Sequence, residues 1–111
     1  MEIKSHNAEN VMVLELDGRF DAYETPKVSQ WLSEHIAPDT ARLVVNLNAV
    51  NFIDSIALAV LVKTIMRCKE NGGDLHLCSV SKPVRIILEL TLLHKVFSIY
   101  DDESSAISSF Q

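Results

Sequence analysis

Hydrophobic and polar residues alternate with a period of two near the N-terminus, which is typical of strands. The segments Glu2–His6 and Val11–Leu16 flank a short polar turn. Within the second segment, Met12, Leu14 and Leu16 recur at every other position, so one face of this strand should be fully buried. Two strands joined by a polar turn predict an N-terminal hairpin.

Further along the chain, apolar residues recur at the spacing of a helix. The first predicted helix begins with Thr25 as its cap and Pro26 at the first helical position, and it ends before Pro38. A second helix is predicted from Ser55 to about Asn71, where Gly72–Gly73 ends it. Its predicted buried stripe consists of Leu58, Leu61, Val62, Ile65 and Cys68.

Three short apolar segments predict further strands, namely Leu43–Leu47, Leu75–Val80 and Val96–Tyr100. Ser81 and Asp102 are predicted to cap two more helices. The resulting order is β-β-α-β-α-β-α-β-α. It predicts an α/β fold in which a mostly parallel sheet of four to five strands, with an N-terminal hairpin, is covered by about four helices.

Length and charge exclude several classes of function. The 111 residues predict a single domain over residues 1–111. Ten Lys and Arg against fifteen Asp and Glu give a net charge of −5, and the basic residues are scattered, so binding to nucleic acid or to an anionic membrane is not expected. The longest apolar run, Ile56–Val62, is too short to span a bilayer, and Met1–His6 does not resemble a signal peptide. We therefore expect a cytoplasmic protein.

The residues that could carry chemistry do not form a motif of an enzyme. Cys68 and Cys78 fit neither a redox pair nor a zinc site and are predicted to be buried thiols that pack as small hydrophobic residues. The four histidines lie on separate predicted elements. We therefore predict no catalytic residue, no cofactor and no metal site; the histidines are His6, His35, His76 and His94.

The pair Asp54-Ser55 stands where the second predicted helix begins. Asp54 is a good helix cap, and Ser55 in the first turn lies beside unpaired amides at the positive end of the helix dipole. A phosphate attached to Ser55 would be stabilised there. From the residues alone, however, the favoured interpretation is that both are simple capping residues.

A resemblance to a known family adds to this interpretation. The segment Leu43–Ser55, LVVNLNAVNFIDS, resembles the signature of the STAS-domain anti-sigma factor antagonists. Gly18–Asp21 is similar to the loop that follows the second strand in that family. Ser81–Arg85 and Leu88–Thr91 are similar to its third helix. Order and spacing agree over nearly the whole chain, which implies the STAS fold.

The resemblance also implies a function. Members of this family bind an anti-sigma factor that is also a serine kinase, and thereby free the sigma factor; phosphorylation of a serine abolishes binding, and a metal-dependent serine phosphatase restores it. By position, Ser55 is the implied phosphoacceptor, Asp54 its required neighbour and Asp21 part of the same partner surface. A monomer or weak dimer is expected. The alternative is a STAS scaffold that is not phosphorylated and binds a partner or small ligand constitutively.

Two departures from the family pattern bear on this surface. The residues after Ser55 are Ile56-Ala57-Leu58-Ala59, where the family usually has Ser or Thr, then Gly, Leu and Gly. Leu92 replaces a glycine at the end of the third helix, which predicts a different turn or a longer helix. Ile56 and Val60 lie off the predicted buried stripe, so they form an exposed apolar patch unless a neighbouring element covers them. The predicted partner surface is Asp21, Asp54, Ser55, Ile56, Ala57, Ala59 and Val60.

Overall fold

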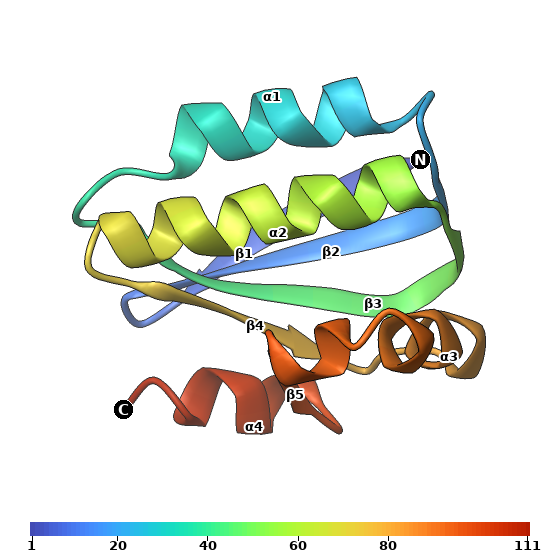
Figure 1. The fold of residues 1–111 in the computed structure, drawn as a ribbon. Coiled ribbons are helices and arrows are strands. Elements are labelled where there is room, and N and C mark those ends of the chain that lie inside the picture. The colour runs from blue at the N-terminus through green and yellow to red at the C-terminus, as the bar shows by residue number, and fades with distance from the viewer.

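A five-stranded sheet organises the computed structural model, which describes residues 1–111. The strands lie side by side in chain order (Figure 1). The first pair is antiparallel and every later pair is parallel, as predicted. The strands are β1 (Glu2–Ala8), β2 (Val11–Phe20), β3 (Arg42–Ile53), β4 (Asp74–Cys78) and β5 (Ser98–Tyr100).

Four α-helices and one short 3-10 helix complete the fold and confirm the predicted order of elements. They are α1 (Thr25–His35), α2 (Ser55–Glu70), α3 (Lys82–Leu90), the 3-10 helix η1 (Leu93–Lys95) and α4 (Glu103–Ser108). Helices α1 and α2 lie over one face of the sheet, and α4 lies against the other (Figure 1). No helix combines the length and the apolar character needed to cross a membrane.

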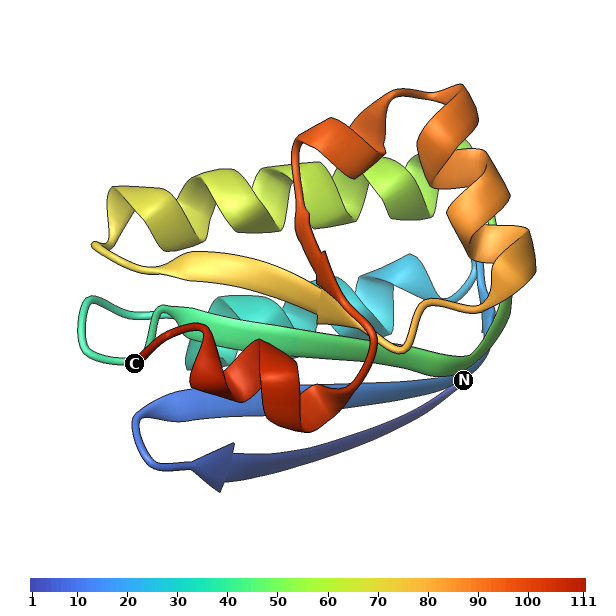
Figure 2. The same ribbon diagram turned by 90° about the horizontal axis from the view of Figure 1, so that it is seen from below.

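The alternation of residues along β3 explains these two layers. Leu43, Val45 and Leu47 point into the main core, which is formed with α1, α2 and α3. Val44 points to the other face and joins a smaller core beneath α4. Helix α4 covers only part of this second face of the sheet, as Figure 2 shows. Asn46, the next residue of β3 on this face, is polar and half-buried. The open part of this face lies over β1, β2 and the middle of β3.

Three strands run further than the sequence pattern predicts. Strand β1 continues past His6 to Ala8, and β3 continues past Leu47 to Ile53. Strand β2 continues past Leu16 through the segment predicted as a loop, and ends at Phe20. Its main chain stays paired with β3, with Asp17 opposite Ala49 and Arg19 opposite Phe52, although the register shifts twice. Main-chain pairing thus continues where the alternation of side chains is interrupted. For this reason the alternation predicted strands that are too short.

The other two parallel strands are shorter than predicted. Strand β4 ends at Cys78, because Ser79 adopts a φ of 54° and turns the chain away from the sheet. Strand β5 begins only at Ser98, after η1 has returned the chain to the sheet. The exposed edge of β1 carries polar residues, and β5 has three residues, so both edges of the sheet are blunt.

The predicted caps are confirmed at α2 and α4 and wrong in detail elsewhere. Asp54 and Asp102 each accept a main-chain N–H of their own helix, and this bond lowers the pKa of Asp102. Ser81 precedes α3, but its hydroxyl donates to the Val50 carbonyl instead. Thr25 is already helical: Glu24 is the capping residue of α1, and the Thr25 hydroxyl donates to the Ala22 carbonyl.

Burial confirms the interpretation of the cysteines and corrects one position of the helix stripe. Cys68 and Cys78 are free and buried, and burial raises the pKa of each thiol to about 11, so both are uncharged at neutral pH. Val62, predicted as part of the buried stripe of α2, is only half-buried. Thr64 is buried instead, and its hydroxyl donates to the Val60 carbonyl one turn earlier.

The turn after α3 contradicts the expectation that the helix runs longer at Leu92. Helix α3 ends at Leu90, with Thr91 as its last capping residue, so it does not run longer. Leu92 adopts a left-handed conformation, with φ of 61° and ψ of 13°, which is the conformation that glycine usually supplies at this place. The turn therefore has the left-handed backbone that glycine adopts easily. In leucine this conformation is sterically strained.

Replacing Leu92 with glycine should raise the free energy of unfolding by about 1 kcal/mol, because the steric cost of the left-handed conformation disappears. The Leu92 side chain is 59% exposed, so little packing is lost. Urea denaturation measures the change. Leu90→Gly is the matched control: Leu90 is also exposed but helical, and its replacement should destabilise the protein. Loss of stability in both variants would contradict strain at Leu92.

Candidate functional site

The carboxylate of Asp54 fixes the geometry at the start of α2. Its Oδ1 accepts the N–H of Ala57 at 2.9 Å, which caps the helix, and its Oδ2 accepts the N–H of Ala22 at 2.9 Å. The Asp54 N–H donates to the Phe20 carbonyl at 3.2 Å. Asp54 therefore ties the first turn of α2 to the end of β2 and to the loop that leads into α1.

Ser55 is the first residue of α2 and is exposed. Asp54 satisfies only the Ala57 amide of the first turn, and the first amides of a helix have no partner within it. The positive end of the helix dipole lies at the same place. An anion on the Ser55 hydroxyl would be close to these amides and would follow directly after the Asp54 carboxylate in the chain.

Asp21 lies on the loop that Asp54 binds, but its side chain is largely occupied. Its Oδ1 accepts the N–H groups of Tyr23 at 3.1 Å and Glu24 at 3.2 Å, and its Oδ2 lies 3.6 Å from Nε of Arg19. The side chain is 18% exposed. Asp21 shapes the loop beside Ser55 and offers a partner only a small part of its own surface.

The residues that follow Ser55 divide between the surface and the core. Ile56 is 52% exposed, and Ala59 is exposed as well. Val60 is half-buried and packs against the main core, so the predicted patch is open at Ile56 and partly covered at Val60. Ala57 is fully buried, and its prediction as a contact residue is wrong, because the third position of α2 faces the sheet.

Two features of this surface were missed in the sequence. Tyr23, directly after Ala22, is 93% exposed, and exposed aromatic side chains are enriched at protein interfaces. The Arg19 guanidinium stacks over the Phe52 ring at 3.9 Å, between neighbouring strands. The only signal for Tyr23 was a lone aromatic residue in a polar loop. Arg19 and Phe52 became neighbours only through the extension of β2 and β3.

Comparison with known proteins identifies the family. The model of the STAS domain matches residues 2–106, and the chain belongs to this family. An anti-sigma F factor antagonist from Paenibacillus polymyxa is 26% identical over 112 residues, which cover 100% of this chain and 96% of that protein. The match therefore covers nearly the whole length of both proteins.

Solved structures agree on the fold. A structure described as a putative anti-sigma factor antagonist from Thermotoga maritima matches with a TM-score of 0.90 and 23% identity, over 97% of this chain and 93% of that one. The phosphorylated form of the Bacillus cell fate determinant SpoIIAA matches with a TM-score of 0.76 and 16% identity, over 99% and 100% of the two chains. The predicted fold and the resemblance are thereby confirmed.

Proposed function

We propose that this protein is an anti-sigma factor antagonist, which binds an anti-sigma factor with serine kinase activity and releases it when Ser55 is phosphorylated. The observation that carries the proposal is the exposed hydroxyl of Ser55 at the start of α2, beside an Asp54 carboxylate held by amides from two elements. The relationship to an anti-sigma F factor antagonist supports it.

Electrostatics gives the switch its direction. The Oγ of Ser55 would form a bond to the γ-phosphorus of ATP as ADP leaves and the hydroxyl proton passes to the kinase. The phosphoserine adds about −1.5 to −2 charges next to Asp54, in a protein whose net charge is already −5. A partner surface that fits a neutral hydroxyl against a carboxylate would then meet repulsion and a desolvation cost.

The switch would act without refolding the domain. Both oxygens of Asp54 are already bound by main-chain amides, so the first turn of α2 does not need to rearrange to hold the phosphate. A serine phosphatase would restore binding by removing one charged group from a preformed surface. That surface comprises Ser55, the exposed Ile56 and Ala59, and the loop with Asp21 and Tyr23.

Incubation with a cognate anti-sigma kinase and ATP should add the mass of one phosphate, because Ser55 is exposed and the helix start favours an anion. Intact-mass spectrometry measures the change. Ser55→Ala should remain unmodified, whereas Ser108→Ala, at an exposed serine of α4, should be modified like the wild type. A wild-type protein that binds the partner but is never modified would favour a constitutive scaffold and overturn the proposed switch.

A further inference from the structure

A second group of polar residues lies on the open face of the sheet and is not part of the surface around Ser55. His6 of β1, Glu15 of β2 and Glu103 at the start of α4 come together there, although they are far apart in the sequence. Their nearest nitrogen and oxygen atoms all lie within 4.8 Å of one another. We infer that these three side chains form a binding site for a zinc ion.

The donor set suits this metal. Imidazole nitrogen and carboxylate oxygen are both ordinary zinc ligands, and three protein ligands leave a fourth position for water or another small ligand. A set of oxygen donors alone would favour magnesium or calcium, so His6 is the residue that directs the choice.

The distance between His6 and Glu103 fits a shared metal better than a direct hydrogen bond. Nε2 of His6 lies 3.4 Å from Oε2 of Glu103. A charge-assisted hydrogen bond between such groups is about 2.7–2.9 Å long. Two ligands about 2.1 Å from a tetrahedral zinc ion are themselves about 3.4 Å apart, so this pair is already spaced to receive the ion.

Asn46 of β3 orients one of the proposed ligands. Its Nδ2 donates to Oε1 of Glu103 at 3.1 Å, and its Oδ1 accepts the N–H of Asn48 at 2.9 Å, so the amide is held from both ends. Oε2 of Glu103 is thereby left toward His6. Hydrogen bonds of this kind to ligating carboxylates are usual around protein metal sites.

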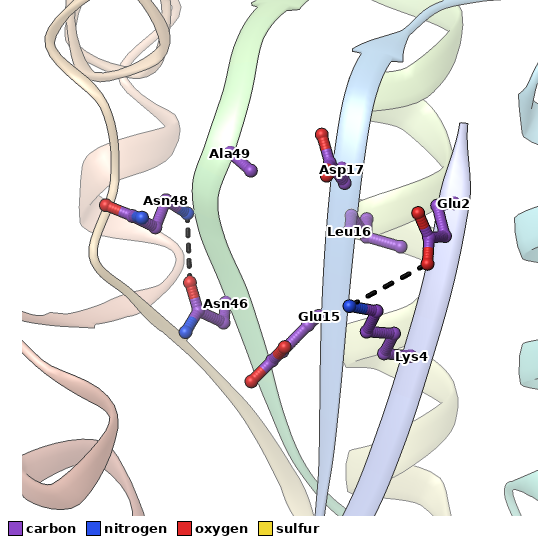
Figure 3. Close-up of a pocket in the computed structure, with 8 residues that line it drawn as sticks. All are labelled: Glu2, Lys4, Glu15, Leu16, Asp17, Asn46, Asn48 and Ala49. Atoms are coloured by element: carbon purple, nitrogen blue, oxygen red, sulfur yellow. Dashed lines mark hydrogen bonds and ion pairs between the residues drawn. The ribbon is translucent and has the colours of Figure 1, made fainter.

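Glu15 has a carboxylate without a cationic partner. The residue opposite it on β1 is Lys4, but the Lys4 ammonium lies 3.7 Å from Glu2 instead. Figure 3 shows Glu15 and Asn46 extending from neighbouring strands. Both line a hollow of about 210 Å³ that adjoins the proposed site at Glu15 and is not lined by His6 or Glu103. Glu15 is half-buried beside Glu103, so two carboxylates repel each other here unless a cation lies between them.

Zinc would add a connection between three elements of the fold, β1, β2 and α4. Helix α4 has six residues, and β1 is the edge strand of the sheet. An ion held by His6, Glu15 and Glu103 would connect both to β2 on the face opposite α1 and α2. This site is independent of Ser55, and its presence or absence does not bear on the proposed switch.

Titration of the chelator-treated full chain with zinc chloride should show one ion bound per molecule in calorimetry, with a midpoint of thermal unfolding several degrees higher at saturation. His6→Gln and Glu103→Gln should each weaken zinc binding at least tenfold. Replacement of zinc by Co²⁺ should give the visible absorption of a tetrahedral site in the wild type. His94→Gln, at a histidine of η1, is the matched control and should bind like the wild type.

Glu15→Gln separates a metal site from an ordinary group of surface charges. Without metal this variant should unfold at the same temperature as the wild type or higher, because one carboxylate of the repelling pair is gone; with zinc it should lose the stabilisation. The inference is overturned if the wild type binds no zinc, if His6→Gln binds zinc as tightly as the wild type, or if magnesium gives the same stabilisation as zinc.

Discussion

Replacing Gly73 with alanine is expected to destabilise the protein by about 3 kcal/mol, the upper part of the usual range for overpacking. A methyl group at this position would overlap the main-chain carbonyl of Ala41, and no side chain can move to relieve the clash. The same carbonyl accepts the Asp74 N–H at 3.0 Å, while the Gly73 N–H donates to the main-chain carbonyl of Cys68 at 2.8 Å. The substitution therefore separates β4 from the chain that enters β3.

The neighbouring glycine provides the control for this prediction. Gly72 has a φ of 81°, and nothing lies within 4 Å of the position that its Cβ would take. Gly72→Ala should cost only about 1 kcal/mol, the cost of the left-handed conformation. Urea denaturation of both variants measures the difference. Equal losses would show that conformation rather than close approach determines the need for glycine at this turn.

Glutamate in place of Ser55 should weaken binding to the anti-sigma partner at least tenfold, which corresponds to about 1.4 kcal/mol. The added carboxylate lies beside Asp54 and imitates part of the charge of a phosphate. Thermal unfolding should change little, because Ser55 is exposed and an acidic residue is favourable in the first turn of a helix. Calorimetric titration with the purified partner measures the affinity.

Two controls define the cause of this loss. Ser108→Glu adds the same charge at an exposed position of α4 and should retain binding, so general repulsion by an acidic protein would be excluded. Ser55→Gln adds similar volume without charge and should bind more tightly than Ser55→Glu. Equal weakening by glutamine and glutamate would show that steric exclusion, not charge, operates the switch.

The sequence predicted the order of elements and the cap at Asp54 because both depend on local patterns. The period of apolar residues identifies β2 and α2, and a carboxylate before a helix identifies Asp54 as its cap. The extension of β2 to Phe20 was not predictable in this way, because it rests on main-chain pairing with β3 through polar residues. The left-handed conformation of Leu92 was not predictable in this way either, because leucine by itself does not favour that conformation.

Contacts between distant segments account for the rest of what the sequence left open. Ala57 faces the sheet because of how α2 is rotated on it, which the alanine itself does not reveal. The bond from Ala22 to Asp54 and the approach of His6 to Glu103 join residues from different elements. These contacts follow from the order of the strands and the placement of the helices. The pattern of residues along the chain specifies neither.

The two edge strands of the sheet, β1 and β5, limit how this protein can bind another protein. An edge strand with free main-chain groups can pair with a strand of a second molecule, and continued pairing leads to aggregation. Here β1 exposes charged residues such as Glu2 and Lys4, and β5 is only three residues long. Neither edge offers a long apolar template, so recognition is left to side chains at the ends of strands and helices. A single altered side chain can then decide whether a partner binds.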